Sequence, residues 1–573
     1  MNGTYPVKEL RIAGTEIGRF AVCVEPGAGE TAAYAAEELR RYIAEATGET
    51  LAATGGDKQI RIFKCGETAD GGSLGEDDFE ISVEAGNLLL KGGGNRGVLY
   101  AIYSFLEETV GCRWYTAEVE RILPAERIDV EEGYRRVERA VFEYRDSFWH
   151  NFINEPEFRV KHKTNTDSGK PIPERLGGRV GYNGFVHTLT TSLCAADKYF
   201  ETHPEYFALR EGVRVPKQLC LTNPDVLKIV TEDVLERLAE NKQRIISVSQ
   251  HDNQEFCTCE RCRAVDEEEG SHMGSLLRFV NAVADAVAER YPDVMVDTLA
   301  YQYTRNIPKH TVPRDNVIIR LCSIECCFRH PLTDEACEEN RRFKKDIEDW
   351  NTICDNLYIW DYTTDFSHYI APFPNFEAIA PNVRFFAEHH VKGLFEQGTY
   401  NGIGGELGEL RGYLLAKLIW NPYMSGEEYR RHLLDFCEGY YGPGGKQIAD
   451  YIGILQETTR DQHVGCFANP AHVLTEYAER LDEINALWDQ AEAAARSEAE
   501  LGRIQKSRMS VMYADLLLRW DERMANGEAE KLAAENKAFY ELYVKHNVRL
   551  NEWGALKEGP DFTKRLDAWE KVR

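Results

Sequence analysis

Between about residue 138 and residue 435, short apolar segments alternate with helix-like segments, and this alternation constrains the fold more than any other feature. The predicted strands are RAVFEYR, GFVHTL, KQLCLTN, RIISVSQ, VMVDTLAY, NVIIRLC, NLYIWDY and VKGLFEQG. Segments such as SLLRFVNAVADAVAERY lie between them and have helical character. About eight strand-helix units over roughly 300 residues predict an α/β fold centred on a (β/α)8 TIM-type barrel.

A compact α/β pattern precedes the predicted barrel. RFAVCVEP alternates like a strand, and TAAYAAEELRRYIAEATG is typical of an amphipathic helix that stops at Gly48. The predicted strands QIRIFKCG, DFEISVEAG and NLLLKGGG follow, and a second helix ends before Gly111. This order predicts a sheet covered by helices on one face, in a small non-catalytic domain at residues 1–132.

Beyond about Ser425 the pattern is helical throughout. Apolar residues recur there at steps of three and four, at Val473, Tyr477, Leu481, Ile484 and Trp488. We therefore expect a catalytic barrel at 133–435 and a helical C-terminal domain at 436–573.

Composition excludes several classes of partner. The net charge of -27 argues against nucleic acid, because phosphate binding requires clustered Lys and Arg. No apolar run approaches the ~20 residues that cross a bilayer, and MNGTYPVKELRIAG does not resemble a secretion signal. The 15 cysteines, several inside apolar runs, indicate free thiols in a reducing, cytoplasmic compartment. The sequence is compatible with a homo-oligomer.

Polar side chains follow the predicted barrel strands, where such barrels carry their active sites. The carboxylates Asp252, Glu325, Asp361 and Glu396 come from separate strands and are the predicted catalytic groups. The predicted substrate-binding residues are Arg145, His187, His251, Asn253, Tyr301, Tyr303, His330, Trp360, Tyr362 and Asp365.

Enzymes that cleave glycosidic bonds use carboxylates beside aromatic rings, and one carboxyl group protonates the leaving oxygen. Glu325 lies among small apolar residues in LCSIECC, so burial would raise its pKa and suit a general acid. Glu396, in GLFEQG, follows a strand that looks buried, so the same argument for a general acid applies to it. Each Asp has a structural alternative as a helix cap, and each His as a hydrogen-bonding partner.

Three cysteines follow the fourth predicted strand as C-x-C-x2-C, at Cys257, Cys259 and Cys262. Reduced thiols that pack a loop are one interpretation. The other is a structural zinc with a fourth ligand from His251 or another loop cysteine. The predicted hydrolysis requires no cofactor.

Longer motifs resemble known families. EELRRYI, DDFEISV, GGGNRGVLYAIYSFLEE and GCRWY look like the α/β domain that precedes the barrel in alpha-glucuronidases and beta-hexosaminidases. HDNQEFCTCERC, TLAYQYT, RLCSIECCFRHPL and IWDYTTDFSHYIAPFPN resemble a bacterial family described as a domain of unknown function, found among carbohydrate-degrading proteins. Beta-hexosaminidases use an Asp-Glu pair at the end of strand four, where this chain has Asp252-Asn253. The scattered carboxylates would fit the inverting arrangement of alpha-glucuronidases.

These features predict a glycoside hydrolase of carbohydrate metabolism that acts on a terminal amino sugar or uronic acid. An arginine in the pocket, such as Arg145 or Arg329, would favour a sugar that carries a carboxylate. Asn253 favours an alternative, a catalytically inactive carbohydrate-binding protein on the same barrel. A zinc-dependent hydrolase is a third hypothesis, which depends on the cysteines.

Overall fold

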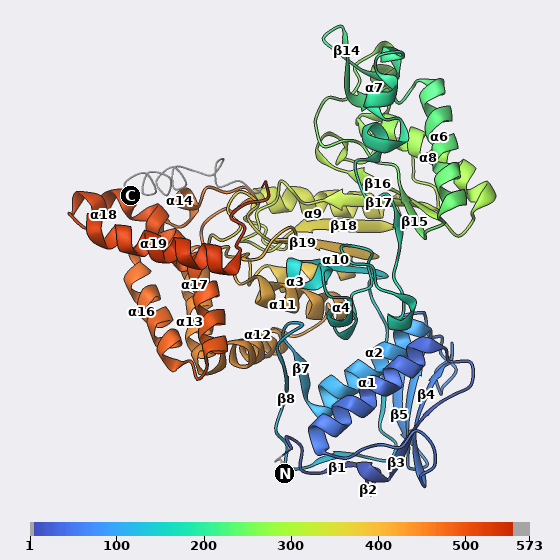
Figure 1. The fold of residues 1–573 in the computed structure, drawn as a ribbon. Coiled ribbons are helices and arrows are strands. Elements are labelled where there is room, and N and C mark those ends of the chain that lie inside the picture. Colours follow the sequence, from blue (N-terminus) through green and yellow to red (C-terminus); the bar gives the residue numbers. More distant parts are fainter. Residues whose placement is uncertain (1–4, 554–573) are drawn as a thin grey trace.

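A computed structural model of the protein describes residues 5–553. Near its N-terminus, the described chain forms a five-stranded sheet with spatial order β10-β5-β6-β4-β3 (Figure 1). These strands are β3 (Phe20–Val24), β4 (Lys58–Lys64), β5 (Phe79–Glu84), β6 (Asn87–Gly92) and β10 (Arg135–Glu138). Helices α1 (Glu30–Thr47) and α2 (Asn95–Phe105) pack together, and a π-helical turn (Leu106–Val110) continues α2 to Gly111. Gly48 ends α1 with φ of 78°, so the predicted helix end is confirmed.

Two small sheets complete this region. They contain β1 (Leu10–Ile12), β2 (Thr15–Glu16) and β9 (Ile128–Val130), and β7 (Cys112–Trp114) and β8 (Glu120–Ile122).

The centre of the molecule is a curled parallel sheet with seven strands in the described residues. In spatial order they are β11 (Tyr144–Phe148), β19 (Gly393–Gln397), β18 (Leu357–Tyr362), β17 (Val317–Cys322), β16 (Met295–Ala300), β15 (Ile245–Ser247) and β12 (Tyr182–Asn183). The curl brings the edge strands together, because the rings of Tyr144 and Tyr182 lie 5.7 Å apart. Asn165 bridges this seam: its N–H donates to the Arg145 carbonyl at 3.2 Å, and its carbonyl accepts from the Val180 N–H at 2.7 Å.

The prediction is wrong for two of the eight barrel strands, because these segments form no strand of the central sheet. KQLCLTN contributes to β14 (Val213–Leu219), which pairs antiparallel with β13 (Phe207–Arg210) outside the central sheet. Its Cys220 is buried with Ala208 of β13 and with Cys257, and its Leu219 belongs to the large hydrophobic core. GFVHTL follows the short strand β12 and forms no strand of its own. The described sheet is therefore a seven-stranded one.

Side chains on the central strands alternate between the inside of the curl and the helices outside. Tyr358 and Phe395 belong to the inner cluster, whereas Ile359 and Leu394 belong to the large core beneath the helices. The outer helices are α3 (His150–Ile153), α4 (Pro156–Lys161), α5 (Ala196–Tyr199), α6 (Pro224–Glu240), α7 (Glu260–Glu269), α8 (Met273–Arg290), α9 (Glu338–Asn351), α10 (Ile379–Glu388) and α11 (Gly408–Trp420).

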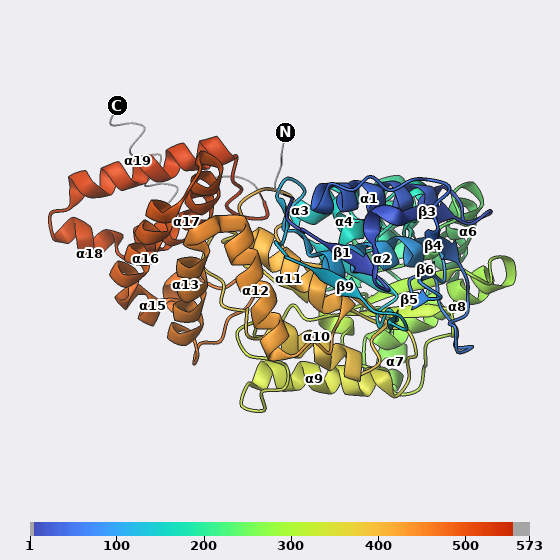
Figure 2. The ribbon, with the colours of Figure 1, turned by 90° about the horizontal axis from the view of Figure 1, so that it is seen from below.

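The rest of the described chain is helical, as the sequence predicts, and lies on the side of the sheet away from α6 and α8 (Figure 2). Its helices are α12 (Gly426–Tyr441), α13 (Gly445–Thr458), α14 (Pro470–Val473), α15 (Thr475–Glu479), α16 (Leu481–Ala494), α17 (Glu498–Leu518), α18 (Trp520–Ala525) and α19 (Ala529–His546). The five apolar positions predicted to form the buried face, from Val473 to Trp488, are all buried. Residues 554–573 of the predicted helical domain lie outside the described residues. None of the helices in 5–553 is both long and apolar enough to cross a membrane.

Candidate active site

A cavity of about 270 Å³ opens where the central strands end, at their carboxyl side. This is the edge at which parallel α/β sheets bind ligands. Aromatic, apolar and acidic side chains form its walls: Val186, His187, Asp252, Leu299, Tyr301, Cys322, Ile324, Trp360, Tyr362, Phe366, Gln397, Tyr400, Phe467 and Glu552.

Five of the predicted site residues line this cavity: His187, Asp252, Tyr301, Trp360 and Tyr362. The Tyr301 hydroxyl donates to Asp252 Oδ1 at 3.0 Å, which fixes the position of the carboxylate. Trp360 Nε1 donates to Gln397 Oε1 at 2.7 Å, which orients the indole ring. His187 has φ of 56°, an uncommon conformation for a residue other than glycine, and its Nδ1 lies 2.7 Å from the Gln250 carbonyl. In the neutral ring, Nδ1 therefore donates and Nε2 is left as an acceptor.

The cavity contains a second carboxylate, Glu552, that sequence reasoning missed. Burial raises the pKa of Glu552, and the negative charge of Asp252 raises it further, while a hydrogen bond from Tyr400 opposes the shift. The Tyr400 hydroxyl donates to Glu552 Oε1 at 3.2 Å. The pocket thus combines Asp252 with a second carboxyl group whose pKa is raised.

The C-terminal segment of the described chain carries Glu552 to the pocket. The Glu552 N–H donates to the Phe366 carbonyl at 2.9 Å, and the Tyr369 N–H donates to the Leu550 carbonyl at 2.9 Å. Asn401 Nδ2 donates to the Glu552 carbonyl at 2.8 Å. Glu552 lies more than 150 residues beyond the last central strand, so the strand-end argument could not identify it. The same argument could have identified Tyr400, which lies three residues after β19.

Two predicted catalytic carboxylates, Asp361 and Glu396, face away from the cavity. They are directly paired across β18 and β19, whereas their neighbours Trp360 and Gln397 line the pocket. Alternation therefore directs both carboxylates to the helix side of the sheet. Burial raises the pKa of Asp361 to about 6, against a hydrogen bond from Ser323. Burial and the charge of Asp361 raise the pKa of Glu396 well above its usual range, and neither of its oxygens has a hydrogen-bond partner.

Glu325 is not buried, so the physical reason for proposing it as a general acid is wrong. Its side chain is 43% exposed and its Oε2 accepts from Arg305 at 3.1 Å. The small residues around it are themselves buried, as Cys326 is, but the glutamate points outward. It does not line the cavity.

Arg145 and Asp365 are held by the scaffold. Arg145 is buried against the N-terminal sheet region, where its guanidinium pairs with Asp77 at 2.9 Å. Asp365 Oδ1 accepts from the backbone N–H groups of Ser367 at 2.9 Å and His368 at 3.1 Å, which is the capping role of an aspartate in a turn. Arg329 is also buried outside the cavity and donates to the Gln456 carbonyl at 2.8 Å.

The other predicted ligands lie beside the cavity without lining it. The Asn253 side chain bonds Gln218 and the Lys217 carbonyl and so holds its own loop. Tyr303 packs on Phe256, with ring centroids 5.2 Å apart. The rings of His251 and His187 lie 5.9 Å apart, and burial together with the charge of His187 lowers the pKa of His251. His330 lies among Cys327, Cys337 and His463.

Beneath the pocket, the sheet encloses a buried ion pair that sequence reasoning also missed. Arg320 and Asp297 are both fully buried, with Nε and Oδ2 3.2 Å apart. Inner aromatic rings surround the guanidinium, including those of Tyr144 at 5.1 Å and Phe185 at 5.1 Å. This pair lies inside the curled sheet among these aromatic rings and does not line the cavity.

A cluster of four cysteines lies in the loop next to the pocket. Cys220, which follows β14, joins the three predicted thiols Cys257, Cys259 and Cys262, and their sulfur atoms lie within 4.8 Å of one another. Cys220 Sγ is 3.7 Å from Cys259 Sγ and 3.8 Å from Cys262 Sγ. A disulfide would require about 2.0 Å, whereas two sulfurs on one tetrahedral zinc lie about 3.8 Å apart. The sulfur positions would fit a zinc ion, with Cys220 as the candidate for the fourth ligand that the sequence left open.

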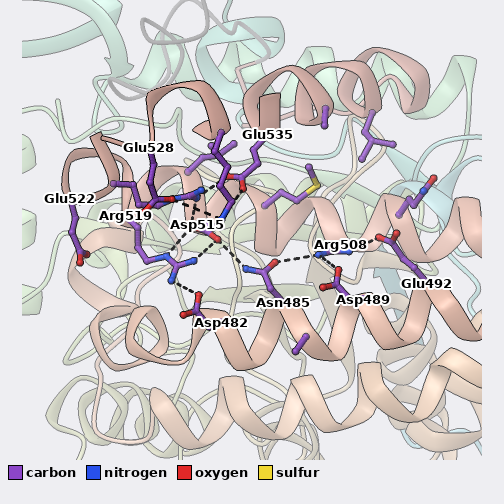
Figure 3. A pocket seen from close by; sticks show the side chains of 18 of the residues that line it. Asp482, Asn485, Asp489, Glu492, Arg508, Asp515, Arg519, Glu522, Glu528 and Glu535 are labelled. Atoms are coloured by element: carbon purple, nitrogen blue, oxygen red, sulfur yellow. Dashed lines mark hydrogen bonds and ion pairs between the residues drawn. The ribbon is translucent and has the colours of Figure 1, made fainter. Parts of the chain in front are cut away.

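A larger cavity of about 770 Å³ lies among the C-terminal helices α16 to α19 (Figure 3). Its charged side chains are paired with one another. Arg519 bonds both Asp515 and Asp482, and Arg508 bonds Glu492 (Figure 3). Among the described residues that line this cavity there is no aromatic side chain, in contrast to the smaller cavity, so we assign the candidate site to the smaller one.

Comparison with known proteins gives one matching protein family, described as "Domain of unknown function (DUF4838)", over residues 114–453. No curated protein matches the chain. Among solved structures, a family GH115 4-O-methyl-alpha-glucuronidase with specificity for decorated arabinogalactans aligns with a TM-score of 0.54 and 12% identity, over 96% of this chain and 79% of that one. A GH138 enzyme targeting pectin rhamnogalacturonan II aligns with a TM-score of 0.47 and 10% identity, over 96% and 98%. The similarity to the GH115 enzyme concerns the fold alone.

Proposed function

Since the chain belongs to the DUF4838 family, which carries no assigned activity, we propose its function from the cavity itself: hydrolysis of a terminal glycosidic bond. The observation that carries this proposal is the pair of carboxyl groups, Asp252 and Glu552, in one aromatic-walled cavity. Glycosidases act with two such groups on either side of the scissile bond. The fold that the chain shares with a glycoside hydrolase supports the same reaction class. We also propose that the central sheet belongs to a barrel of eight strand-helix units.

The size and charge of the cavity indicate the kind of sugar. About 270 Å³ is near the lower end of ligand pockets, which span roughly 300–1,000 Å³, and favours a single terminal unit. Rings such as Trp360 and Phe467 offer flat surfaces to the apolar faces of a sugar. Among the described residues that line the cavity there are two carboxylates and no lysine or arginine. An amino sugar or a neutral sugar therefore suits this pocket better than a uronic acid.

The two carboxyl groups differ in environment, which suggests their roles. Glu552, whose pKa is raised by burial, is the proposed general acid for the leaving oxygen. Asp252, oriented by Tyr301, is the proposed partner that acts on the opposite face of the sugar, as base or nucleophile. His187 and Gln397 are placed to bond sugar hydroxyls.

Hydrolysis of a panel of aryl glycosides, including amino, neutral and uronic sugars, tests this proposal. On the sugar that is cleaved, we expect Glu552→Gln and Asp252→Asn each to lower kcat/KM by at least about 100-fold. Glu325→Gln, at an exposed glutamate outside the cavity, is the matched control and should retain activity. Full activity in both pocket variants would refute the assignment of these residues. Sugar binding by calorimetry without turnover of any glycoside would instead favour the inactive carbohydrate-binding protein.

We further propose that the four-cysteine cluster binds a structural zinc. All four ligands come from the protein and are buried, which leaves no open coordination position for a catalytic water. The zinc would hold the loop after β14 to the loop that follows Asp252. Cys259→Ser should therefore lower the melting temperature and remove one zinc per chain by elemental analysis. An unchanged zinc content would contradict this site, and with it the remaining basis for a zinc-dependent hydrolase.

A further inference from the structure

A second cluster of metal-ligating side chains lies on the other side of the pocket. Cys327, His330 and Cys337 come from the loop between β17 and α9, and His463 comes from the loop between α13 and α14. One sulfur or ring nitrogen from each residue lies within 4.8 Å of the others. His463 is 126 residues from Cys337, so sequence spacing does not reveal the set.

The distances within this cluster match those between ligands of one metal ion. Cys327 Sγ is 3.4 Å from His330 Nδ1, and Cys337 Sγ is 3.6 Å from His463 Nδ1. Zinc bonds sulfur at about 2.3 Å and nitrogen at about 2.0–2.1 Å, which places a sulfur and a nitrogen on one tetrahedral ion roughly 3.5–3.6 Å apart. Two cysteines and two histidines are a common ligand set for a structural zinc.

The groups around the ligands support the same interpretation. His330 Nε2 lies 2.8 Å from the Arg460 carbonyl, so Nε2 carries the proton and Nδ1 presents its lone pair to the cluster. Zinc-binding histidines usually bond a carbonyl or carboxylate in this way. The Val464 N–H points at Cys327 Sγ at 3.4 Å, a contact that stabilises a thiolate. Glu339 Oε2, 3.3 Å from His463 Nδ1, adds a carboxylate at the rim.

We propose that Cys327, His330, Cys337 and His463 form a zinc site that joins the central sheet to the C-terminal helices. The two loops already share a backbone bond, from the Phe328 N–H to the Val464 carbonyl at 2.7 Å. The first loop begins beside Ile324 and the second leads to Phe467, and both of these residues line the cavity. The zinc therefore fixes two walls of the pocket relative to each other. Its role is structural, since the protein supplies all four ligands.

Zinc content of the untagged full-length protein, measured by inductively coupled plasma mass spectrometry, tests this site. His463 is half exposed, so His463→Ala should fold and should contain one zinc per chain less than the wild type. His472→Ala, at an exposed histidine of α14, is the matched control and should keep the wild-type content. Cys327→Ser should lose the same single zinc. Equal zinc content in the wild type, His463→Ala and Cys327→Ser would overturn the proposal.

X-ray absorption at the zinc edge separates this site from the four-cysteine cluster. In the Cys259→Ser variant, the remaining zinc should show two sulfur and two nitrogen neighbours. A remaining zinc with only oxygen and nitrogen neighbours, or no remaining zinc in a folded variant, would contradict the assignment. Neither readout depends on glycoside hydrolysis, so failure of this proposal and failure of the proposed function are distinguishable.

Discussion

At the scale of single residues, the direction in which a side chain points separates the candidate catalytic groups. Asp361 and Glu396 have the burial expected of active-site carboxylates, yet they face the helices and not the cavity. Two adjacent carboxyl groups in this environment must share or retain protons, because burying two negative charges side by side without a cation is costly. They therefore destabilise the folded protein in a pH-dependent way and are not placed to act as a catalytic pair.

This cost predicts how stability depends on pH. The folded protein retains protons on Glu396 and Asp361 that the unfolded chain releases above about pH 4–5. The free energy of unfolding therefore falls as pH rises from there through the raised folded-state pKa values. Glu396→Gln removes part of this loss and should be more stable than wild type by about 1–3 kcal/mol at pH 8, with little difference at pH 4. Urea unfolding at both pH values measures this, and a variant that is less stable at pH 8 would contradict it.

A second prediction concerns Tyr400. Its hydroxyl bonds Glu552 and opposes the rise in the pKa of that carboxyl group. A general acid must be protonated, so activity falls as pH rises through its pKa. Tyr400→Phe should therefore move the alkaline limb of the kcat/KM profile to higher pH. Tyr423→Phe, at an exposed tyrosine, should leave the profile unchanged. A limb that stays in place or moves to lower pH in Tyr400→Phe would be inconsistent with Glu552 as the acid.

At the scale of elements, apolar patterns predicted most of the strands and helices. The predictions were wrong where an apolar segment is buried by something other than the central sheet. The strands that became β15 to β19 have long apolar stretches that the sheet buries on both faces. KQLCLTN has a similar pattern, but its apolar residues are buried beside a hairpin outside the central sheet, Leu219 in the large core and Cys220 with the other cysteines of the loop. A single sequence does not specify which partner buries an apolar face, so the choice between sheet and hairpin could not be made.

The inner face of the sheet carries a further prediction. Arg320 and Asp297 are paired inside the curl, with both side chains fully buried. Arg320→Met would leave the aspartate without its cation, and we expect a loss of about 3–5 kcal/mol in the free energy of unfolding. Replacing both residues, as Arg320→Met with Asp297→Leu, should recover much of this loss. In contrast, Arg314→Met, at the exposed pair with Asp285, should cost less than about 1 kcal/mol. Denaturant unfolding distinguishes the two pairs, and equal small losses would contradict the structural role of Arg320.

At the scale of the whole molecule, the pocket is assembled from parts of the chain that are distant in sequence. The ends of the central strands and the loops that follow them supply most of its walls, and the C-terminal segment adds Glu552. The sequence predicted the edge of the sheet where the cavity lies, and five of the residues that line it. It could not predict Glu552, because that residue is held at the pocket by contacts with residues distant in sequence, such as the Phe366 carbonyl and the Asn401 side chain. Long-range contacts of this kind leave no periodic pattern in the sequence.

The most direct test of this arrangement is a crystal structure of the Glu552→Gln variant with the cleaved sugar or its inhibitor bound. We expect one sugar ring at the carboxyl ends of the strands, against Trp360 and between Asp252 and residue 552. Binding there would also give the separation of the two carboxyl groups, about 5 Å for retention or roughly 6.5–9.5 Å for inversion. A sugar bound instead in the cavity among α16 to α19, or one that leaves both Asp252 and residue 552 uncontacted, would contradict the proposed site.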